Sequence, residues 1–309
     1  MLCLGNLCFL QDIKEMSVII SHVIGGLGNQ MFQYAAGRSL SIAHDVQLLL
    51  DIRDFAGYRL HQGFELMRVF DCPVAVAGSQ DVRDVLGWQS SRLARRVLAR
   101  PALRFLHHRH LAVEPHFNYW AGIAQVLPPA YLVGYWQSER YFAHVAEIIR
   151  SDFTFKQPLS AENQKLAERI GATSAVSLHV RRGDYLSNPK ALATHGICSA
   201  AYYENAIRYI AARVEDANFF IFSDDLDWVR SNLRIDHPCH FVDNNAGIES
   251  YNDMRLMSLC KHHVIANSSF SWWGAWLNSG QEKIVVAPRQ WFANKNDVKD
   301  LFPCGWVLL

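Results

Sequence analysis

Two adjacent arginines, Arg181 and Arg182, directly follow an apolar run over residues 175–180. Such a run is typical of a buried strand, whose alternation puts His179 and Arg181 on one face and Arg182 on the other. Each guanidinium can bind phosphate oxygens in a bidentate manner, so the pair suits a diphosphate held without a metal ion. Because ligands of open α/β sheets bind at the carboxyl ends of the strands, the pair predicts an anion site.

Two alternative roles for this segment stay open. Arginine pairs are often solvated or held in surface salt bridges, where they contribute little. Arg182-Gly183-Asp184 is also the adhesion tripeptide. Adhesion requires an exposed loop tip, whereas this tripeptide abuts a predicted core strand, so we favour the anion site.

A glycine turn, Gly25-Gly26-Leu27-Gly28, lies between a predicted strand and a predicted helix. This is the context of a phosphate-binding turn, and Asn29 adds an amide that a plain turn would not need. The turn departs from the dinucleotide fingerprint, because Met31 stands where the third glycine belongs. Asp51, at the end of the next predicted strand, keeps a nicotinamide cofactor open as an alternative. A simple tight turn is the other alternative.

An acidic pair, Asp224-Asp225, ends a predicted strand. One of these carboxylates could cap the following helix. A carboxylate could also recognise guanine, because the N1–H and the exocyclic amine of the base both donate to one acceptor group. The pair is similar to the acidic motif through which other nucleotide-sugar enzymes hold a metal, but the arginine pair makes a metal less necessary.

The segment Asn267-Ser268-Ser269 opens a predicted helix over residues 270–278. The serines could simply be helix caps. A helix N-terminus lined with hydroxyl groups is also an anion site, because unpaired backbone N–H groups and the helix dipole favour phosphate. The helix carries three tryptophans, which are more typical of core packing than of sugar stacking.

The elements around these motifs alternate between strands and helices. A strand over 17–24, a helix over 31–43 and a strand over 46–51 form a βαβ start. The second half repeats strand–helix units, which predicts a parallel, doubly wound sheet; its strands are expected at 175–180, 218–222, 240–242, 263–266 and 283–287.

Domain boundaries follow from breaks in this pattern. Gly171 follows a polar helical stretch, which predicts an N-terminal domain over 17–170 and a C-terminal domain over 171–309. Residues 1–16 are expected outside the fold, with Met16 as an alternative start of translation.

Composition narrows the class of protein. Of 309 residues, half are apolar and 19% are charged, and the net charge is +1. That is typical of a globular protein and gives no indication of nucleic-acid binding. Seven cysteines without a Cys-x-x-Cys pair argue against a disulfide framework or a zinc knuckle, which favours a reducing cytoplasm. No apolar run reaches the roughly 20 residues that span a bilayer.

One stretch has an unusual charge pattern. Residues 85–113 contain no Asp or Glu but six arginines. A solvated or partner-facing helix is one interpretation. A second interpretation is docking of residues 92–110 to the anionic cytoplasmic face of the inner membrane, beside a lipid-linked acceptor.

Three motifs in order resemble those of the α-1,2-fucosyltransferases, glycosyltransferase family 11. The resemblance spans nearly all of residues 17–309. It rests on residues 25–34 (GGLGNQMFQY), 179–185 (HVRRGDY) and 266–276 (ANSSFSWWGAW), with support from 222–225 (FSDD) and 250–254 (SYNDM).

The resemblance implies a GT-B-like arrangement of two Rossmann-like domains with a cleft between them. The implied donor, GDP-β-L-fucose, would bind mainly to the C-terminal domain, and the N-terminal domain would lie on the acceptor side. Transfer would invert the sugar, use neither metal nor cofactor, and form an α-1,2 linkage to a galactoside. By position, Arg181 and Arg182 would clamp the diphosphate, with His179 and Asp184 beside the donor.

The catalytic residues are therefore expected to be Arg181, Arg182 and Asp184. Asp184 is the first candidate for the general base, followed by Glu249 and His195. The donor site is expected to comprise His179, Arg181, Arg182, Asp224, Asp225, Asn267, Ser268, Ser269, Gly26, Gly28 and Asn29.

Differences from the animal members of this family refine the expectation. The chain shows no membrane anchor and carries 15 extra residues at its start, which points to a bacterial cytoplasmic enzyme of O-antigen or similar surface-glycan synthesis. Two competing classes remain, a nucleotide-binding oxidoreductase and a non-catalytic carbohydrate-binding protein. Neither has a use for the arginine pair.

Overall fold

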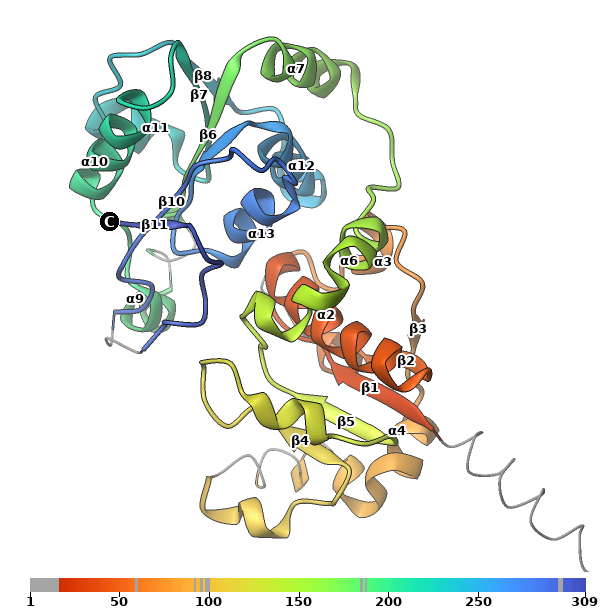
Figure 1. The fold of residues 1–309 in the computed structure, drawn as a ribbon. Coiled ribbons are helices and arrows are strands. Elements are labelled where there is room, and N and C mark those ends of the chain that lie inside the picture. Colours follow the sequence, from red (N-terminus) through yellow and green to blue (C-terminus); the bar gives the residue numbers. More distant parts are fainter. Residues whose placement is uncertain are drawn as a thin grey trace, which may run out of the picture. The chain divides into compact units, whose positions relative to one another are not determined.

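The computed structural model describes residues 17–309, apart from 59–60, 92, 95–96, 98–100, 184–185, 187 and 294–296. The expectations about residues 1–16 and Met16 therefore lie outside the described residues. The chain divides into two compact units, Met1–Thr154 and Phe155–Leu309 (Figure 1).

The N-terminal unit is built on a five-stranded sheet in the order β3-β2-β1-β5-β4. Every strand pairing in it is parallel. Its strands are β1 (Val18–His22), β2 (Gln47–Asp51), β3 (Ala75–Val76), β4 (Leu111–Val113) and β5 (Ala130–Val133). The predicted βαβ start is confirmed, whereas β3 and β4 are too short to leave a periodic signal in the sequence.

Helices cover both faces of this sheet. Helix α2 (Leu27–His44) lies on one face, where Gly37 packs so closely that an added Cβ would lie 2.9 Å from Leu48. Helix α4 (Ser79–Leu86) packs on the other face against Ile20, Leu49 and Tyr131. The remaining helical segments of the unit are η1 (Arg53–Phe55), α3 (Leu66–Val69), η2 (Gly87–Ser90), η3 (Pro101–Leu106), η4 (Ala121–Gln125), η5 (Glu139–Tyr141), η6 (Ala143–Val145) and α6 (Ala146–Asp152).

The C-terminal unit is built on a six-stranded parallel sheet in the order β11-β10-β9-β6-β7-β8. Its strands are β6 (Ser174–Val180), β7 (Ala217–Ser223), β8 (Cys239–Val242), β9 (His262–Val264), β10 (Val285–Ala287) and β11 (Val307–Leu308). The predicted repetition of strand–helix units is confirmed.

Helices sandwich this second sheet as well (Figure 1). Helices α10 (Ala200–Ala211) and α11 (Leu226–Asn232) pack on one face, against Leu178 and Ile221. Helices α7 (Ala161–Gly171) and α12 (Tyr251–Leu259) pack on the other face. The remaining helical segments are α9 (Pro189–His195), η7 (Gly247–Glu249) and α13 (Ser269–Leu277).

One sequence-based expectation, the domain boundary, differs from the structure. The division falls at 154–155 rather than 170–171, because α7 buries Ile170 in the core shared with α12. The spacing of Ser250 and Asp253 is that of a capping box, but the Ser250 side chain makes no capping hydrogen bond. Asp253 instead accepts a hydrogen bond from the Asn245 amide at 2.8 Å.

Each sheet reverses its strand order beside its first strand. β1 lies between β2 and β5, and β6 lies between β7 and β9. The loops after β1 and β6 therefore start at topological switch points, where open α/β sheets bind ligands. The two parallel sheets with helices on both faces confirm the predicted class of two Rossmann-like domains.

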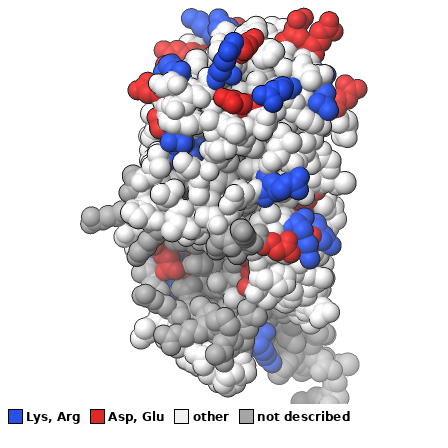
Figure 2. Space-filling view, turned by 90° about the vertical axis from the view of Figure 1, so that its left-hand side faces the viewer, with Lys and Arg blue, Asp and Glu red and all other residues white. Residues whose placement is uncertain are grey.

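The surface charge is mixed. On the face shown in Figure 2, basic and acidic side chains are interspersed rather than gathered into a field of one sign. Within the described ranges, no helix is both long enough and apolar enough to cross a bilayer.

Candidate active site in the C-terminal unit

Arg181 follows the last residue of β6, at the switch point of the C-terminal sheet. Its Nε lies 3.3 Å from Asp224 Oδ2, and a quarter of its side chain is exposed. Asp224 follows β7, which pairs with β6 so that Val180 faces Ser223. The guanidinium is therefore held at the carboxyl edge of the sheet by a carboxylate from the neighbouring strand, while part of it stays open to solvent.

Asp224 organises the backbone of the same loop. Its Oδ1 accepts a hydrogen bond from the Arg182 N–H at 2.8 Å. Burial by itself would raise the pKa of Asp224, but the Arg181 charge and the Arg182 and Gly183 N–H groups lower it below the ordinary range. Gly183 packs so closely that an added Cβ would lie 3.2 Å from the Asp224 carbonyl oxygen. Asp224 is therefore an ionised anchor for the arginine loop.

Arg182 points to the opposite face, as strand alternation predicts. Its guanidinium carbon lies 3.8 Å from the centre of the Trp228 ring on α11. Its Nε is 3.6 Å from Asp225 Oδ2, which is too long for a hydrogen bond. Among the described residues, this buried Nε has no hydrogen-bond partner. The charged group is thus held in place while donor capacity remains for an anion.

His179, two residues before Arg181, is almost fully buried. Burial and then the Arg181 charge lower its pKa to about 3, so the imidazole is neutral at physiological pH. Its ring lies 5.9 Å from the Phe270 ring in the first turn of α13. Its Nδ1 makes no hydrogen bond within the described part of the chain. The contact with Phe270 brings the end of β6 beside the start of α13.

Helix α13 begins with the serines identified in the sequence. Ser268 is its N-cap, and its hydroxyl accepts a hydrogen bond from the Phe270 N–H at 3.3 Å. Ser269, in the first turn, is half-buried. No acidic residue occupies this turn. The positive end of the helix dipole therefore lies next to His179 without a neutralising carboxylate.

Two residues assigned to donor binding have structural partners instead. The Asp225 carboxylate caps α11 by accepting from the Trp228 N–H at 3.1 Å. The Asn267 side chain is buried, and its amide group donates to the carbonyl oxygens of His195, Gly196 and Trp291. Its oxygen accepts from the Cys198 thiol at 3.4 Å. The Asn267 amide therefore binds the segment between α9 and α10 and the loop at Trp291, and it is not presented to solvent.

The three candidates for the general base have different outcomes. Asp184 lies outside the described residues. Glu249 is exposed on η7, where it accepts from the Asn252 amide at 3.0 Å. The His195 ring, at the end of α9, lies 5.6 Å from the Phe292 ring.

The glycine turn belongs to the N-terminal unit and opens α2. Gly25 has a φ of +91°, and Gly26 is the N-cap without a side-chain cap. Gly28 is buried in the first turn. The Asn29 side-chain oxygen accepts from the Gln137 amide at 2.8 Å. These residues shape the carboxyl edge of the first sheet, next to the loop that follows β5.

The sequence analysis did not identify Trp228, on whose ring the Arg182 guanidinium stacks. The signal was present, because an aromatic residue in the first turn of the helix after Asp224-Asp225 falls on the same sheet edge as the arginines. In the described ranges, no cluster of three or more His, Cys, Asp or Glu side chains is arranged to hold a metal ion.

Chemically, the arrangement has the features that an anion site requires. Two guanidinium groups flank the end of β6, and the uncompensated charge of the α13 N-terminus lies beside them through the His179–Phe270 contact. Preorganised donors of this kind stabilise negative charge that grows on a leaving group. The site is suited to binding a phosphate-bearing ligand and to assisting its departure.

Known proteins have sequences similar to that of this chain. The model of glycosyl transferase family 11 matches residues 106–309. An α-1,2-colitosyltransferase of Escherichia coli is 35% identical over 94% of this chain and 99% of its own length. The O-antigen biosynthesis glycosyltransferase WbnK of Escherichia coli is 34% identical over 92% of this chain and 98% of its own length.

A more distant relative and a solved structure are also similar to this chain. Galactoside α-(1,2)-fucosyltransferase 1 of Saimiri boliviensis boliviensis is 30% identical over 48% of this chain and 43% of its own length. The crystal structure of the fucosyltransferase NodZ from Bradyrhizobium superposes with a TM-score of 0.51 at 16% identity, covering 84% of this chain and 91% of NodZ, and so shows a shared fold of the GT-B type. With its family model matched over most of the chain and similar full-length relatives in Escherichia coli, the protein belongs to glycosyltransferase family 11.

Proposed function

We propose that the protein is a galactoside α-1,2-fucosyltransferase of bacterial surface-glycan synthesis. It would transfer L-fucose from GDP-β-L-fucose with inversion of configuration at the anomeric carbon. The observation that carries the proposal is the pair Arg181 and Arg182, each oriented at the carboxyl edge of the C-terminal sheet. The names of relatives support the linkage, since two of them are α-1,2-transferases. The similarity to WbnK supports a role in O-antigen synthesis.

The donor would bind with its diphosphate between the arginine pair and the start of α13. Arg181 and Arg182 would each direct N–H groups to phosphate oxygens, and the Ser269 N–H and hydroxyl would meet the same group from the helix N-terminus. His179, being neutral, could donate one N–H without adding charge. Asp224 would hold the arginine loop rather than bind guanine, because Arg181 already neutralises it.

Departure of GDP would be assisted by these groups. Cleavage of the bond between fucose and phosphate places negative charge on the diphosphate, and the two guanidinium groups stabilise that charge. They supply the positive charge that a divalent cation provides in other transferases. We therefore propose transfer without a metal ion or a cofactor.

The acceptor galactoside would bind to the N-terminal unit, residues 17–154. Its 2-hydroxyl must lose a proton as it attacks the anomeric carbon, and Asp184 remains our first candidate for the group that receives the proton. Asp184→Asn keeps the shape of the side chain and removes its basicity. It should lower kcat strongly and leave the affinity for GDP within about threefold.

Colitose is the alternative to fucose as the transferred sugar. A full-length relative is named a colitosyltransferase. Colitose is L-fucose without its 3-hydroxyl, so GDP-colitose would present the same diphosphate to the arginine pair. The nicotinamide alternative has no comparable support, because neither the family nor the arginine pair has a role in hydride transfer.

The decisive experiment incubates the full chain with GDP-fucose and lactose in EDTA and measures free GDP and fucosylated trisaccharide. Trisaccharide formed in the presence of the chelator supports donor, linkage class and metal independence together. GDP release without trisaccharide keeps the donor and rejects lactose as acceptor. If no acceptor gives GDP release and GDP does not stabilise the protein thermally, the proposal is overturned. A parallel assay with GDP-colitose decides between the two sugars.

A further inference from the structure

Polar and aromatic side chains gather at the carboxyl edge of the N-terminal sheet. The group centres on the loop of residues 134–138 after β5 and on Glu114 after β4. β5 lies next to β1, so this loop starts at the switch point of the sheet, beside the glycine turn. Ligands of open α/β sheets bind at this kind of edge.

The loop contains a strained residue. Trp136 has a φ of +56°, a left-handed conformation that bulky side chains rarely adopt. Its ring is fully buried, and its Nε1 has no hydrogen-bond partner among the described residues. The Ser138 N–H donates to the Trp136 carbonyl oxygen at 2.8 Å, which tightens the turn. Strain of this kind persists where the surroundings enforce it, and such residues cluster at ligand sites.

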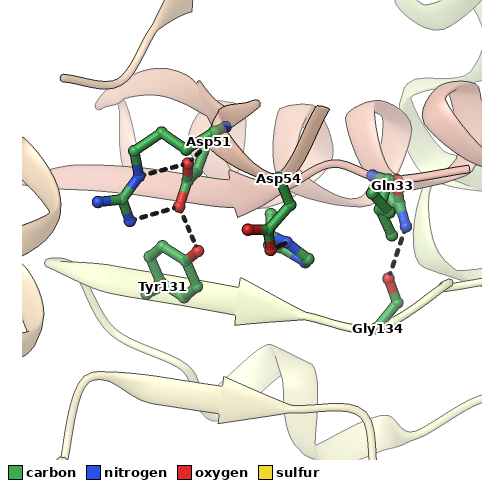
Figure 3. Close-up of polar contacts among 8 residues, drawn as sticks. Gln33, Asp51, Asp54, Tyr131 and Gly134 are labelled. Carbon is green, nitrogen blue, oxygen red and sulfur yellow. Dashed lines mark hydrogen bonds and ion pairs between the residues drawn. The ribbon is translucent and has the colours of Figure 1, made fainter. Parts of the chain in front are cut away.

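Three neighbouring side chains enforce the conformation. The Glu114 carboxylate accepts from the Tyr135 N–H at 2.7 Å and from the Trp136 N–H at 3.1 Å. The Gln33 amide donates to the Gly134 carbonyl oxygen at 3.1 Å (Figure 3). The Gln137 amide donates to the Asn29 side chain at 2.8 Å. The loop is therefore fixed to the end of β4 through Glu114 and to the early turns of α2.

The consequence of this strained turn is that one aromatic side chain faces solvent beside buried neighbours. Tyr135 is 47% exposed, whereas Trp136 is 0% and Gln137 8% exposed. A tyrosine ring offers an apolar face together with a polar hydroxyl. Such a ring, held by a rigid backbone, is suited to stack on the apolar face of a sugar.

Glu114 supplies the complementary polar group. It is half-buried, and burial raises its pKa to about 7 although two backbone N–H groups oppose the shift. A carboxylate can accept about four hydrogen bonds, so two backbone donors leave capacity for a ligand hydroxyl. A carboxylate beside an exposed aromatic ring is the chemistry that neutral saccharides require.

Two nearby carboxylates at this edge are already occupied. Figure 3 shows Asp51 bound by Arg53 and by the Tyr131 hydroxyl from β5. Asp54 pairs with His22 at 2.8 Å. These contacts fix β1, β2 and β5 to one another at the edge of the sheet. Unlike Asp51 and Asp54, Glu114 pairs with no described cationic side chain.

We propose that Tyr135 and Glu114 form the acceptor-sugar site, in which a galactoside ring stacks on Tyr135 and one of its hydroxyls donates to Glu114. The proposal rests on the proposed function, since it names residues for the acceptor of that reaction. It assigns to Trp136 a positioning role, because the left-handed turn at Trp136 directs Tyr135 outward.

The test measures the KM for lactose, the KM for GDP-fucose and the slow release of GDP without acceptor. Tyr135→Ala should raise the KM for lactose by about tenfold or more, the effect of a lost stacking contact of ordinary strength. Tyr135→Phe should stay within about threefold of wild type. The KM for GDP-fucose and acceptor-free GDP release should not change. Glu114→Gln, which keeps the size of the side chain, should also raise the KM for lactose.

Two controls make the result interpretable. Leu127→Ala removes another exposed apolar side chain of the same unit, 67% exposed, and should leave every parameter unchanged. Saturation-transfer NMR with lactose reports binding without turnover and should lose its signal in Tyr135→Ala. An unchanged lactose KM in both variants of an active enzyme would overturn the site. Absence of transfer by wild type with GDP-fucose would instead overturn the proposed function.

Discussion

The Arg182 guanidinium lies over the Trp228 ring, 3.8 Å from its centre, while Asp225 both caps the helix that carries this ring and approaches the same arginine. The helix after β7 thus orients a charge that belongs to the loop after β6. We expect Trp228→Ala to release Arg182 into alternative rotamers and to raise the KM for GDP-fucose by about tenfold. Steady-state kinetics would show it, and an unchanged donor KM would contradict an orienting role for Trp228.

Arg181→Ala should lower turnover much more than it lowers stability. Loss of a preorganised donor to the leaving group costs about 3–4 kcal/mol in the transition state, or about a hundredfold to a thousandfold in kcat. Arg213→Ala is the control, because Arg213 is an arginine of the same unit that has no role in the proposed donor site. Its guanidinium lies over the Tyr209 ring at 3.6 Å, near the end of α10. Near-normal kcat in Arg181→Ala would reject the diphosphate clamp.

Asn267→Ala should destabilise the protein. The substitution leaves the carbonyl oxygens of His195, Gly196 and Trp291 without the amide that now binds them, at a cost of about 1–3 kcal/mol. Denaturant unfolding should show a lower midpoint, with GDP still able to stabilise the variant. Unchanged stability combined with lost GDP binding would return Asn267 to the donor site.

The stability of the protein should respond to pH through Asp253. Burial raises its pKa from 3.8 to about 7, against the hydrogen bond from Asn245. The folded state therefore binds a proton that the unfolded state releases near its ordinary pKa. This contribution is complete below about pH 4 and is lost as the pH rises through about 7.

A neutral substitution tests this titration. Relative to wild type, Asp253→Asn should gain on the order of 4 kcal/mol between pH 4 and pH 8, measured by denaturant unfolding at each pH. Asp236→Asn, at an exposed carboxylate, is the control. Parallel stability curves for Asp253→Asn and wild type would show that Asp253 does not titrate in this range.

We also propose that the N-terminal unit binds anionic membranes. The segment predicted to dock to the membrane is 92–110, in which Leu93 is 74% and Phe105 80% exposed. Trp88, just before this segment, is 70% exposed. Gln89 joins the two ends of this surface, because its amide contacts the Leu106 carbonyl oxygen and the His108 N–H at 2.8 Å each. Four of the arginines on which the prediction depends lie outside the described residues, namely Arg92, Arg95, Arg96 and Arg100.

The expected result is cosedimentation with phosphatidylglycerol vesicles that weakens at high salt and is absent with phosphatidylcholine. A Trp88→Ser/Phe105→Ser double variant should lose it. Ile248→Ser, which removes an exposed apolar residue of the other unit, should not. Self-association of wild type without vesicle binding, detected by light scattering, would assign the surface to a second copy of the chain.

The sequence predicted the C-terminal half better than the N-terminal half, for a physical reason. Strands such as β6 and β7 are buried on both faces, so they appear as mainly apolar runs followed by helical periodicity. β3 and β4 have two and three residues, and the segment between them includes 3-10 turns rather than long helices. Such segments are determined by tertiary contacts and leave no periodic signal.

For the candidate site, the positions of the side chains could be predicted from the sequence, but their contact partners could not. Arg181 and Arg182 fall on opposite faces, as alternation requires, whereas the commitment of Asn267 and Asp225 to protein contacts depends on the folded surroundings. Glu114 was missed because its proposed role depends on Trp136, 22 positions later, adopting a left-handed conformation. No local pattern encodes that relationship.

The placement of the first strand of each unit at the centre of its sheet has a consequence for how this enzyme can diversify. In each half, the loop that we propose for ligand binding directly follows the central strand, and the chain passes from one half to the other once, near Thr154. A recombination event at that crossing would exchange a complete half without cutting a sheet. Sugar donors and acceptors could thus be re-paired by exchanging modules, so chimeras joined between Thr154 and Phe155 are the natural starting point for engineering new glycosidic linkages.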